Sequence, residues 1–192
     1  IDNARVMMDA PEPPALDGSA APVAAALLDA GIEQTGEPAP LLCIAEPVVA
    51  GSGGSYVAVL PSDRFRASFI FEHGHPMAGM QAAHFDSGCD DYAKTVAPAR
   101  TFGFIEEVEA LRSAGLALGG SEENAVVIYP DRYSSGLRFE NEFARHKLLD
   151  LVGDARLAGP GRPYAHFIGV RSGHTLNIEA VKLFMENAVA GN

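Results

Sequence analysis

The order of short strand-like runs and longer helical runs is the feature that most constrains the fold of this 192-residue chain. After residue 40, short apolar runs are separated by turn residues such as Gly51-Ser52-Gly53-Gly54, a pattern typical of an antiparallel sheet. Longer runs with apolar residues at helical spacing follow. Strands grouped before helices favour the α+β class, here a two-layer helix/sheet sandwich. The expected strands are 4–8, 41–49, 56–60, 65–71, 125–129 and 164–170, and the expected helices are 89–96, 105–114, 139–152 and 173–189.

The amino-terminal part differs from the rest of the chain. Pro22 lies in the first turn of a helical run that Gly31 would end. Residues 33–40 are polar and contain proline, as is common at a boundary between domains. We therefore expect residues 1–38 to be the remnant of a first α+β domain and residues 39–192 to be a second α+β domain. Because the chain starts with isoleucine and not methionine, we also expect that an amino-terminal piece precedes it.

The composition narrows the classes of partner. Apolar residues make up 47% of the chain, which is enough for a buried core. The net charge of -11 argues against a nucleic-acid backbone as the main partner, because binding to phosphates needs basic surface. No apolar run is long enough for a membrane-spanning helix. The two cysteines, Cys43 and Cys89, have neither metal-ligand spacing nor the number that a disulfide scaffold needs. We expect a cytoplasmic monomer with reduced thiols.

A histidine and an aspartate four residues apart, His146 and Asp150, share one face if their segment is helical. Projection at about 100° per residue groups Asp154 with them and places an apolar face on the other side. Imidazole nitrogen and carboxylate oxygen are both zinc ligands, so the spacing suits a metal site. Many surface helices carry such a pair and bind nothing, and the spacing alone leaves both interpretations open. The apolar face consists of Ala144, Leu148, Leu151, Val152 and Ala155.

Neighbouring residues favour the functional interpretation. Lys147 can offer an ammonium group to an anionic substrate. Gly153 is placed to end the helix in the left-handed conformation, which would put Asp154 in a loop where its carboxylate can orient a distant base. His174, after Ser172 and Gly173, is a second histidine at the predicted start of another amphipathic helix.

Five motifs carry a resemblance to a known family. They are Arg100-Thr101-Phe102-Gly103-Phe104, Leu118-Gly119-Gly120-Ser121, Leu137-Arg138-Phe139-Glu140, Arg145-His146-Lys147-Leu148-Leu149-Asp150 and Ser172-Gly173-His174. In order and spacing they resemble UDP-3-O-acyl-N-acetylglucosamine deacetylase, the zinc enzyme that commits Gram-negative bacteria to lipid A synthesis. The likeness extends to residues 1–3 and 16–22, so it covers nearly the whole chain. The resemblance implies zinc-dependent removal of acetyl from UDP-3-O-acyl-N-acetylglucosamine, which yields acetate.

The resemblance implies a role for each matching residue. His146 and Asp150 would be zinc ligands, and Thr101 would donate to the oxyanion that forms at the acetamide carbonyl. His174 would be the cationic acid, held by Asp154. Lys147 would lie near the polar head of the substrate.

Residues 101–128 resemble the βαβ insert of the family, which forms a passage for the acyl chain. The lining residues would be Phe102, Phe104, Val108, Ala117, Ser121 and Ala125, and by sequence alone each of them would be assigned to an ordinary core. For Arg171, both a phosphate contact and a solvated surface position are expected alternatives.

The resemblance also implies parts that this sequence lacks. Metal-assisted amide hydrolysis needs a general base, and a catalytic zinc has three protein ligands plus water. In the family, the third ligand is a histidine that follows the glutamate base, in a motif shortly before the stretch that matches residue 1. We expect both to lie upstream of Ile1. His73 and His75, with His84 nearby, are weak candidates for a substitute ligand, and we expect His166 to be structural.

Three functions stay open from the sequence. The leading one is the zinc deacetylase activity of a complete protein to which this chain contributes. The second is a non-catalytic protein that binds a nucleotide sugar or an acyl chain. The third is a zinc hydrolase of different specificity built on His73 or His75. The residues before Ile1 and the zinc content of the chain discriminate between these functions, whereas no motif sets the preferred acyl length.

Overall fold

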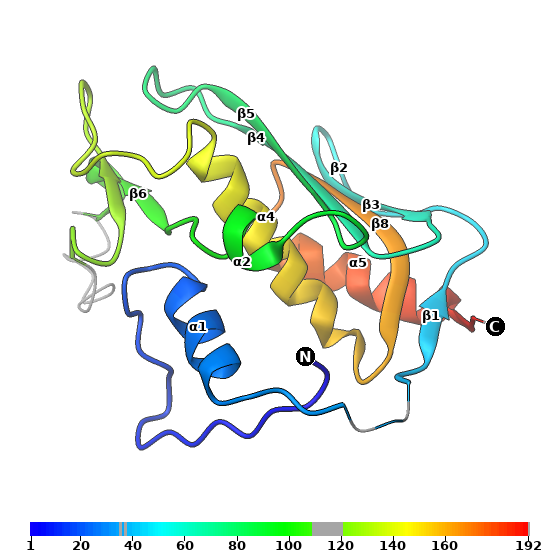
Figure 1. The fold of residues 1–192 in the computed structure, drawn as a ribbon. Coiled ribbons are helices and arrows are strands. Elements are labelled where there is room, and N and C mark those ends of the chain that lie inside the picture. The colour runs from blue at the N-terminus through cyan, green and yellow to red at the C-terminus, as the bar shows by residue number, and fades with distance from the viewer. Residues whose placement is uncertain (35, 37, 109–120, 192) are drawn as a thin grey trace.

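The computed structural model describes residues 1–34, 36, 38–108 and 121–191, and it has a mixed α+β fold (Figure 1). The strands are β1 (Leu41–Cys43), β2 (Val48–Ser52), β3 (Ser55–Pro61), β4 (Arg66–Glu72), β5 (Met80–Asp86), β6 (Phe102–Phe104), β7 (Val126–Ile128), β8 (Arg162–Val170) and β9 (Val189–Ala190). The helices are α1 (Ala21–Asp29), α2 (Tyr92–Thr95), α4 (Glu142–Ala155) and α5 (His174–Asn187), and a 3-10 turn, η1, spans Arg156–Ala158. Within the described part of the chain, no helix is long and apolar enough to cross a membrane.

Strand β8 is the centre of the larger sheet, which has seven strands. It runs antiparallel to β3 and parallel to both β4 and β1. Strand β5 extends the sheet beyond β4, and β2 extends it beyond β3. The remaining two strands, β6 and β7, form a separate parallel pair. The sheet is therefore mixed, and its central strand comes late in the sequence.

The helices α4 and α5 lie against one face of this sheet (Figure 1). Helix α4 packs on β4 and β5, and α5 packs on β2 and β3. Burial alternates along β4, where Ala67, Phe69 and Phe71 are buried and the residues between them are not. This alternation arises because successive strand side chains point to opposite faces. Burial of each large apolar side chain contributes about 1.5–3 kcal/mol, so this interface stabilises the orientation of both helices.

Helix α4 has the apolar face that its sequence predicts. Ala144, Leu148, Leu151 and Ala155 are buried, and Val152 is half-buried. His146 and Asp150 lie on the opposite face of the helix, where both are partly exposed. The core therefore fixes both the axis and the rotation of the helix on which the candidate site depends.

Several expectations about strands are wrong. Residues 4–8 form no strand, because their side chains project into solvent, with Met7 88% exposed, and no neighbouring strand pairs with them in the described part. The single strand expected at 41–49 is two strands, β1 and β2, separated by a bend before Pro47. The expectation of a purely antiparallel sheet fails because β1 and β4 both pair in parallel with β8. Strands β5, β6 and β9 were not expected from strand patterns.

Expectations about helices were closer. Helix α1 begins with Pro22 in its first turn, and Gly31 follows it with a φ of +87°, as predicted. The predicted end of α4 is wrong, because the helix runs through Gly153 and places Asp154 in its last turn instead of a loop. The helix expected at 89–96 shortens to α2, capped by the Asp91 carboxylate. Residues 105–108 are helical, and the rest of the helix expected at 105–114 lies outside the described residues.

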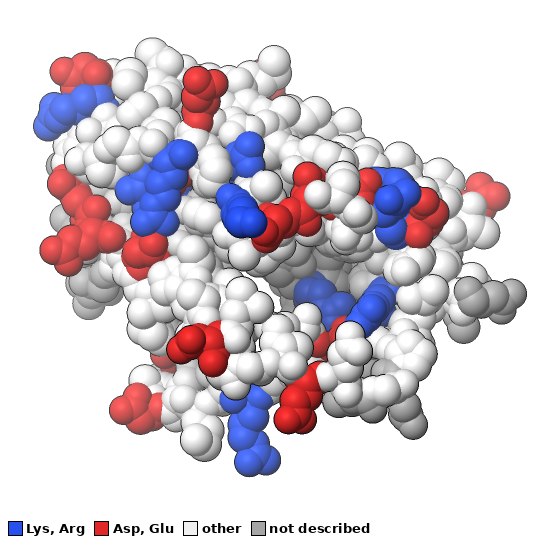
Figure 2. Space-filling view, viewed as in Figure 1, with Lys and Arg blue, Asp and Glu red and all other residues white. Residues whose placement is uncertain are grey.

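The amino-terminal segment crosses below the sheet layer (Figure 1). Figure 2 shows a hollow on this face with basic side chains inside it. A cavity of about 650 Å³ is lined by residues 1–5, by the end of α1 and residues that follow it, and by Arg162. Arg162 pairs with Asp2 at 2.6 Å across it. A separate contact joins the segment to the body, since the backbone N–H of Thr101 donates to the Gly18 carbonyl at 2.7 Å.

Candidate active site

One pocket gathers most of the polar residues singled out from the sequence. It has a volume of about 550 Å³. Helix α4 contributes three side chains, the first residue of β6 and the residue before it one each, and β4 and the first residue of α5 one each. The lining residues are Phe71, Thr101, Phe102, His146, Lys147, Asp150 and His174. Residues that are far apart in the sequence therefore meet at the outer face of α4.

His146 is held in one tautomer by a backbone carbonyl. Its Nδ1 lies 3.1 Å from the Ala99 oxygen. Because a carbonyl oxygen only accepts hydrogen bonds, Nδ1 carries the proton and Nε2 keeps a free lone pair. Burial lowers the pKa of His146, which outweighs the opposing effect of the nearby Asp150 carboxylate. The ring is thus neutral and oriented, as a metal-binding imidazole must be.

Asp150 faces His146 one turn further along α4. Its Oδ1 lies 3.6 Å from His146 Nε2, and both side chains are 13% exposed. The other oxygen, Oδ2, accepts a hydrogen bond from Lys147 Nζ at 2.7 Å. Lys147, expected near a substrate's polar head, therefore lines the pocket while paired with Asp150. One carboxylate oxygen is oriented by the ammonium, and the other faces the imidazole.

The pair fits two positions of a zinc site. Two ligands at ordinary zinc distances and a tetrahedral angle lie about 3.4 Å apart, close to the 3.6 Å between Nε2 and Oδ1. The donor set of imidazole nitrogen and carboxylate oxygen is also suitable. Among the described residues, no group of three or more His, Cys, Asp or Glu side chains has the arrangement of a metal site. The described residues thus offer two candidate ligands at this place.

A second His–Asp pair lies at the edge of the same pocket. His174 opens α5, and its Nδ1 donates to Asp154 Oδ2 at 2.9 Å. Asp154 is 13% exposed, whereas His174 is 64% exposed. Although the sequence placed Asp154 in a loop, the last turn of α4 brings its carboxylate to the same partner. The carboxylate fixes the Nδ1 proton, so His174 Nε2 is the atom free to exchange a proton with a bound molecule.

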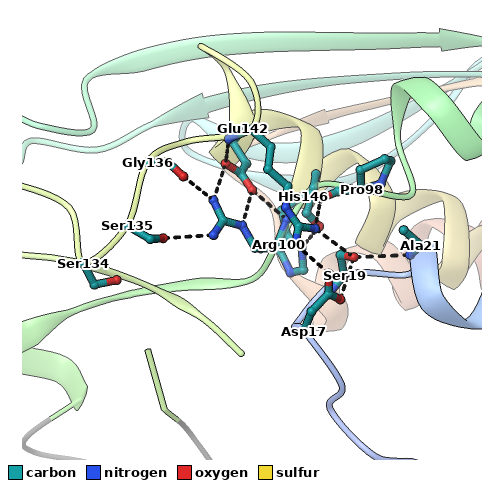
Figure 3. A network of polar contacts seen from close by, with 12 residues as sticks. Asp17, Ser19, Ala21, Pro98, Arg100, Ser134, Ser135, Gly136, Glu142 and His146 are labelled. Carbon is teal, nitrogen blue, oxygen red and sulfur yellow. Dashed lines mark hydrogen bonds and ion pairs between the residues drawn. The ribbon is translucent and has the colours of Figure 1, made fainter. Parts of the chain in front are cut away.

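Beneath the pocket, a buried ion pair fastens residues 99–101 to α4 (Figure 3). The carboxylate of Glu142, which is fully buried, accepts from Arg100 Nε at 2.9 Å and from Arg100 Nη2 at 3.1 Å. It also accepts from the backbone N–H groups of Arg100 at 3.1 Å and Arg138 at 2.6 Å. Burial by itself raises the pKa of Glu142, but these donors outweigh it, and the pKa is lowered. The pair sits between Ala99, which orients His146, and Thr101, which lines the pocket.

Arg100 makes further contacts in this network (Figure 3), and Arg138 extends it to other segments. Arg100 also donates to Ser135 Oγ at 2.9 Å and to the Gly136 carbonyl at 2.8 Å. Arg138 donates to the Pro98 carbonyl at 2.8 Å and pairs with Asp17 at 2.7 Å. Sequence reasoning missed this support. The motif that contains Arg100 was recognised, but Glu142 shows no signal because a glutamate in a first helical turn is ordinary on a surface.

The other residues named from the sequence lie outside the pocket lining, except Phe102. Phe104 is buried on β6 and stacks with His73 at a ring-centroid distance of 4.0 Å, while His75 lies 5.3 Å from it. These two histidines thus pack on the β6–β7 pair and do not join His146. Ser121 and Ala125 form the turn before β7, and Val108 lies against Gly103. Ala117 lies outside the described residues.

Two further residues have contacts remote from the pocket. Arg171, expected as a phosphate contact or a surface residue, is 45% exposed and pairs with Glu72 at 3.3 Å. His166 lies on β8 and its Nε2 is 2.8 Å from Ser68 Oγ, whose other neighbour is His84 Nδ1 at 2.9 Å. These imidazoles belong to the sheet and not to the pocket, in agreement with the structural role expected for His166.

Comparison with known proteins agrees with the motifs. A sequence model of the family LpxC, UDP-3-O-acyl N-acetylglycosamine deacetylase, matches residues 1–186. The chain is 44% identical over 183 residues to UDP-3-O-acyl-N-acetylglucosamine deacetylase of Geobacter sp., covering 94% of this chain and 60% of the relative. It is 46% identical over 182 residues to the enzyme of that name from Acidithiobacillus ferrooxidans, covering 92% and 59%. The chain therefore spans about 60% of the length of these curated relatives. By sequence and by the motifs that line its pocket, the chain belongs to the UDP-3-O-acyl N-acetylglycosamine deacetylase family.

Proposed function

We propose that the complete protein hydrolyses the acetamide of UDP-3-O-acyl-N-acetylglucosamine, giving UDP-3-O-acyl-glucosamine and acetate, the committed step of lipid A synthesis. The observation that carries the proposal is the pocket in which His146, Asp150, Thr101 and His174 meet in a member of this family. Two relatives, from Geobacter sp. and Acidithiobacillus ferrooxidans, are named for this reaction as UDP-3-O-acyl-N-acetylglucosamine deacetylase. Because the chain spans about 60% of their length, the activity is proposed for the complete protein and not for this chain alone.

His146 Nε2 and Asp150 Oδ1 would hold a zinc ion. The neutral, oriented imidazole and the 3.6 Å separation of the two atoms support this assignment. When bound, zinc supplies a Lewis acid that polarises the amide carbonyl and makes water a stronger acid. The third ligand and the general base, a histidine and a glutamate in the family, would come from the part of the relatives that this chain does not cover.

Thr101 would donate its hydroxyl to the oxygen of the acetamide as that oxygen gains charge. Its backbone is fixed at both ends, because its N–H donates to Gly18 and its carbonyl accepts from Val126. A donor held in place before the reaction is effective because no reorganisation is needed when charge develops. His174 would pass the proton on Nε2 to the departing amine nitrogen, while Asp154 balances the charge of the imidazolium. Lys147 would keep the carboxylate of Asp150 oriented through their hydrogen bond.

Residues 101–128 would form the insert that carries the acyl chain. Aromatic contacts next to the pocket support this, since Phe102 lies 5.4 Å from Phe71 and 6.4 Å from Phe104 by ring centroid. Val108, Ala117, Ser121 and Ala125 would complete the passage, by analogy with the family. Residues 1–38 would belong to a first domain and residues 39–192 to a second, a two-layer sandwich of helices on the sheet. Both cysteines are free thiols, which supports action in the cytoplasm.

The test is acetate release by the complete protein and by two histidine variants. His146→Ala removes one proposed ligand, and we expect a loss of at least about 100-fold in kcat/KM, in the range that follows from a lost metal ligand or its support. His84→Ala is the matched control, since this imidazole lies on the outer sheet face and lines no part of the pocket. Undiminished acetate release by His146→Ala would refute the proposal, and a wild-type protein that binds but does not deacetylate the nucleotide sugar would favour a binding function.

A further inference from the structure

A buried asparagine adjoins the Asp154–His174 pair without lining the pocket. Asn177 is fully buried on α5, one turn after His174. Its Nδ2 donates to Asp154 Oδ2 at 2.8 Å, the same oxygen that accepts from His174 at 2.9 Å. Since Asn177 is not among the residues that line the pocket, any effect it has on a bound molecule must pass through Asp154.

Ser172 orients the amide of Asn177. Its Oγ donates to Asn177 Oδ1 at 2.8 Å, and Ser172 is itself buried. This bond leaves the NH₂ end of the amide facing Asp154. The flipped amide would bring its oxygen against the acceptor oxygen of the carboxylate, and neither of those atoms has a proton to donate. Among the described residues no buried side-chain nitrogen or oxygen lacks a partner, so this arrangement is also fully satisfied.

His174 depends on this support because little else holds it. The imidazole is 64% exposed, and in the described part of the chain Asp154 is its hydrogen-bond partner. A carboxylate held by one exposed ring could rotate with that ring. A second donor from a buried, oriented amide fixes the carboxylate independently of the imidazole.

We propose that Asn177, oriented by Ser172, is a positioning residue that holds Asp154 so that His174 keeps its proton on Nδ1 and presents Nε2 to the pocket. The inference rests on the function proposed above and extends it from the residues that line the pocket to two residues behind them. A role confined to packing α5 predicts a change in stability alone. A positioning role predicts a change in the tautomer of His174.

The experiment compares two changes at the same residue type on α5. The first variant combines Ser172→Ala with Asn177→Leu. It removes the Asn177 amide, and it also removes the Ser172 hydroxyl, which would otherwise be left without an acceptor. The control is Asn187→Leu, at the exposed end of α5, where the amide donates to the Leu183 carbonyl of the same helix. Ser172→Ala alone is a milder variant that leaves the amide in place. The complete protein, labelled with ¹⁵N-histidine, is studied by NMR at alkaline pH, and the His174 signals are assigned by their loss in His174→Gln.

We expect a single Nδ1–H tautomer in the wild type and in the control, and a mixture with Nε2–H in the double variant. Ser172→Ala alone should shift the tautomers in the same direction by a smaller amount. The kcat for acetate release should fall at least about 10-fold in the double variant, which is the lower end of the losses seen when residues that support an active-site side chain are mutated. The KM should change less than about threefold.

If the double variant folds and keeps the wild-type tautomer and kcat, the positioning role is overturned. If the double variant does not fold, an unchanged His174 tautomer in Ser172→Ala overturns it instead. Loss of the tautomer preference in a protein whose wild type releases no acetate would support the positioning role and overturn the proposed function.

Discussion

Replacing Glu142 with alanine removes the acceptor at the centre of the network below the pocket. The carboxylate is fully buried and accepts two hydrogen bonds from the Arg100 guanidinium and two from backbone N–H groups. Breaking a buried ion pair from one side costs about 3–5 kcal/mol, because the partner charge stays buried. Each backbone N–H left without an acceptor adds about 1–3 kcal/mol before relaxation. Relative to a total stability of about 5–15 kcal/mol, Glu142→Ala should be severely destabilising.

Glu142→Gln is the milder variant, because it retains the volume and one oxygen acceptor. We expect a destabilisation of about 2 kcal/mol, the difference expected when hydrogen bonds to a charged group become bonds to a neutral one. Glu140→Ala, two residues earlier and exposed, is the control and should stay within about 0.5 kcal/mol of the wild type. Urea unfolding of the complete protein measures these differences. If Glu142→Ala lost less than about 1 kcal/mol, the assignment of Glu142 as the central acceptor would be refuted.

The same network predicts the sign of a pH effect. Burial alone would raise the pKa of Glu142, but hydrogen bonds from Arg100 and Arg138 lower this pKa below its usual value of 4.5. A folded-state pKa below the unfolded one contributes stability that is fully present above the unfolded pKa and is lost as pH falls through the folded pKa. The stability difference between wild type and Glu142→Gln should therefore be constant from neutral pH to about pH 5 and shrink below pH 4.5. A difference that grows on acidification would contradict the lowered pKa.

Three further predictions follow from the pocket and its supports. Gly18→Ala should destabilise the protein by more than about 2 kcal/mol, because its φ is +79° and a Cβ there would lie 1.9 Å from the Asn124 carbonyl oxygen. The control Gly53→Ala, at a φ of +65° with nothing within 4 Å of the added Cβ, should cost only about 1 kcal/mol. Equal losses of stability in thermal unfolding would contradict the clash at Gly18. The Asp17–Arg138 pair, with side chains 31% and 36% exposed, should show a double-mutant coupling below about 1 kcal/mol that weakens with salt. A larger coupling that does not change with salt is the behaviour of a buried pair and would contradict this prediction. A chelator should abolish acetate release by the complete protein, and added zinc should restore it. The circular dichroism spectrum should stay unchanged, because the core that packs against α4 is apolar and does not depend on a metal. Unfolding of the protein on chelation would contradict this prediction.

Local periodicity accounts for the parts of the fold that were predicted. Helix α5 and strands β3 and β8 lie within two residues of their expected bounds, because apolar spacing and turn residues are encoded nearby. Pairing between strands is different. The parallel contact of β4 with β8 joins Arg66 to His166, and nothing near either residue specifies the partner. Strand β5 was missed for the same reason, since its Met80–Asp86 sequence becomes a strand by pairing with β4.

The predicted end of α4 failed where a local preference met the core. Glycine commonly ends a helix, and Gly153 was placed to do so. Ala155, two residues later, is buried against the sheet layer, so continuing the helix brings an apolar side chain into the core and keeps its backbone bonded. Asp154 consequently reaches His174 from a helical turn.

By itself, the sequence determined the family, the α+β class and the shared face of His146 and Asp150. Motif order and the four-residue helical spacing are properties of the chain read locally. Tertiary structure alone decided which atom of each side chain is available. The Ala99 carbonyl selects the His146 tautomer, Lys147 occupies one oxygen of Asp150, and buried Glu142 and Asn177 orient the groups behind the pocket. Apart from the Lys147–Asp150 bond within α4, these contacts join residues distant in sequence. A hydrogen bond depends on distance and direction in space, which residue type and spacing do not encode.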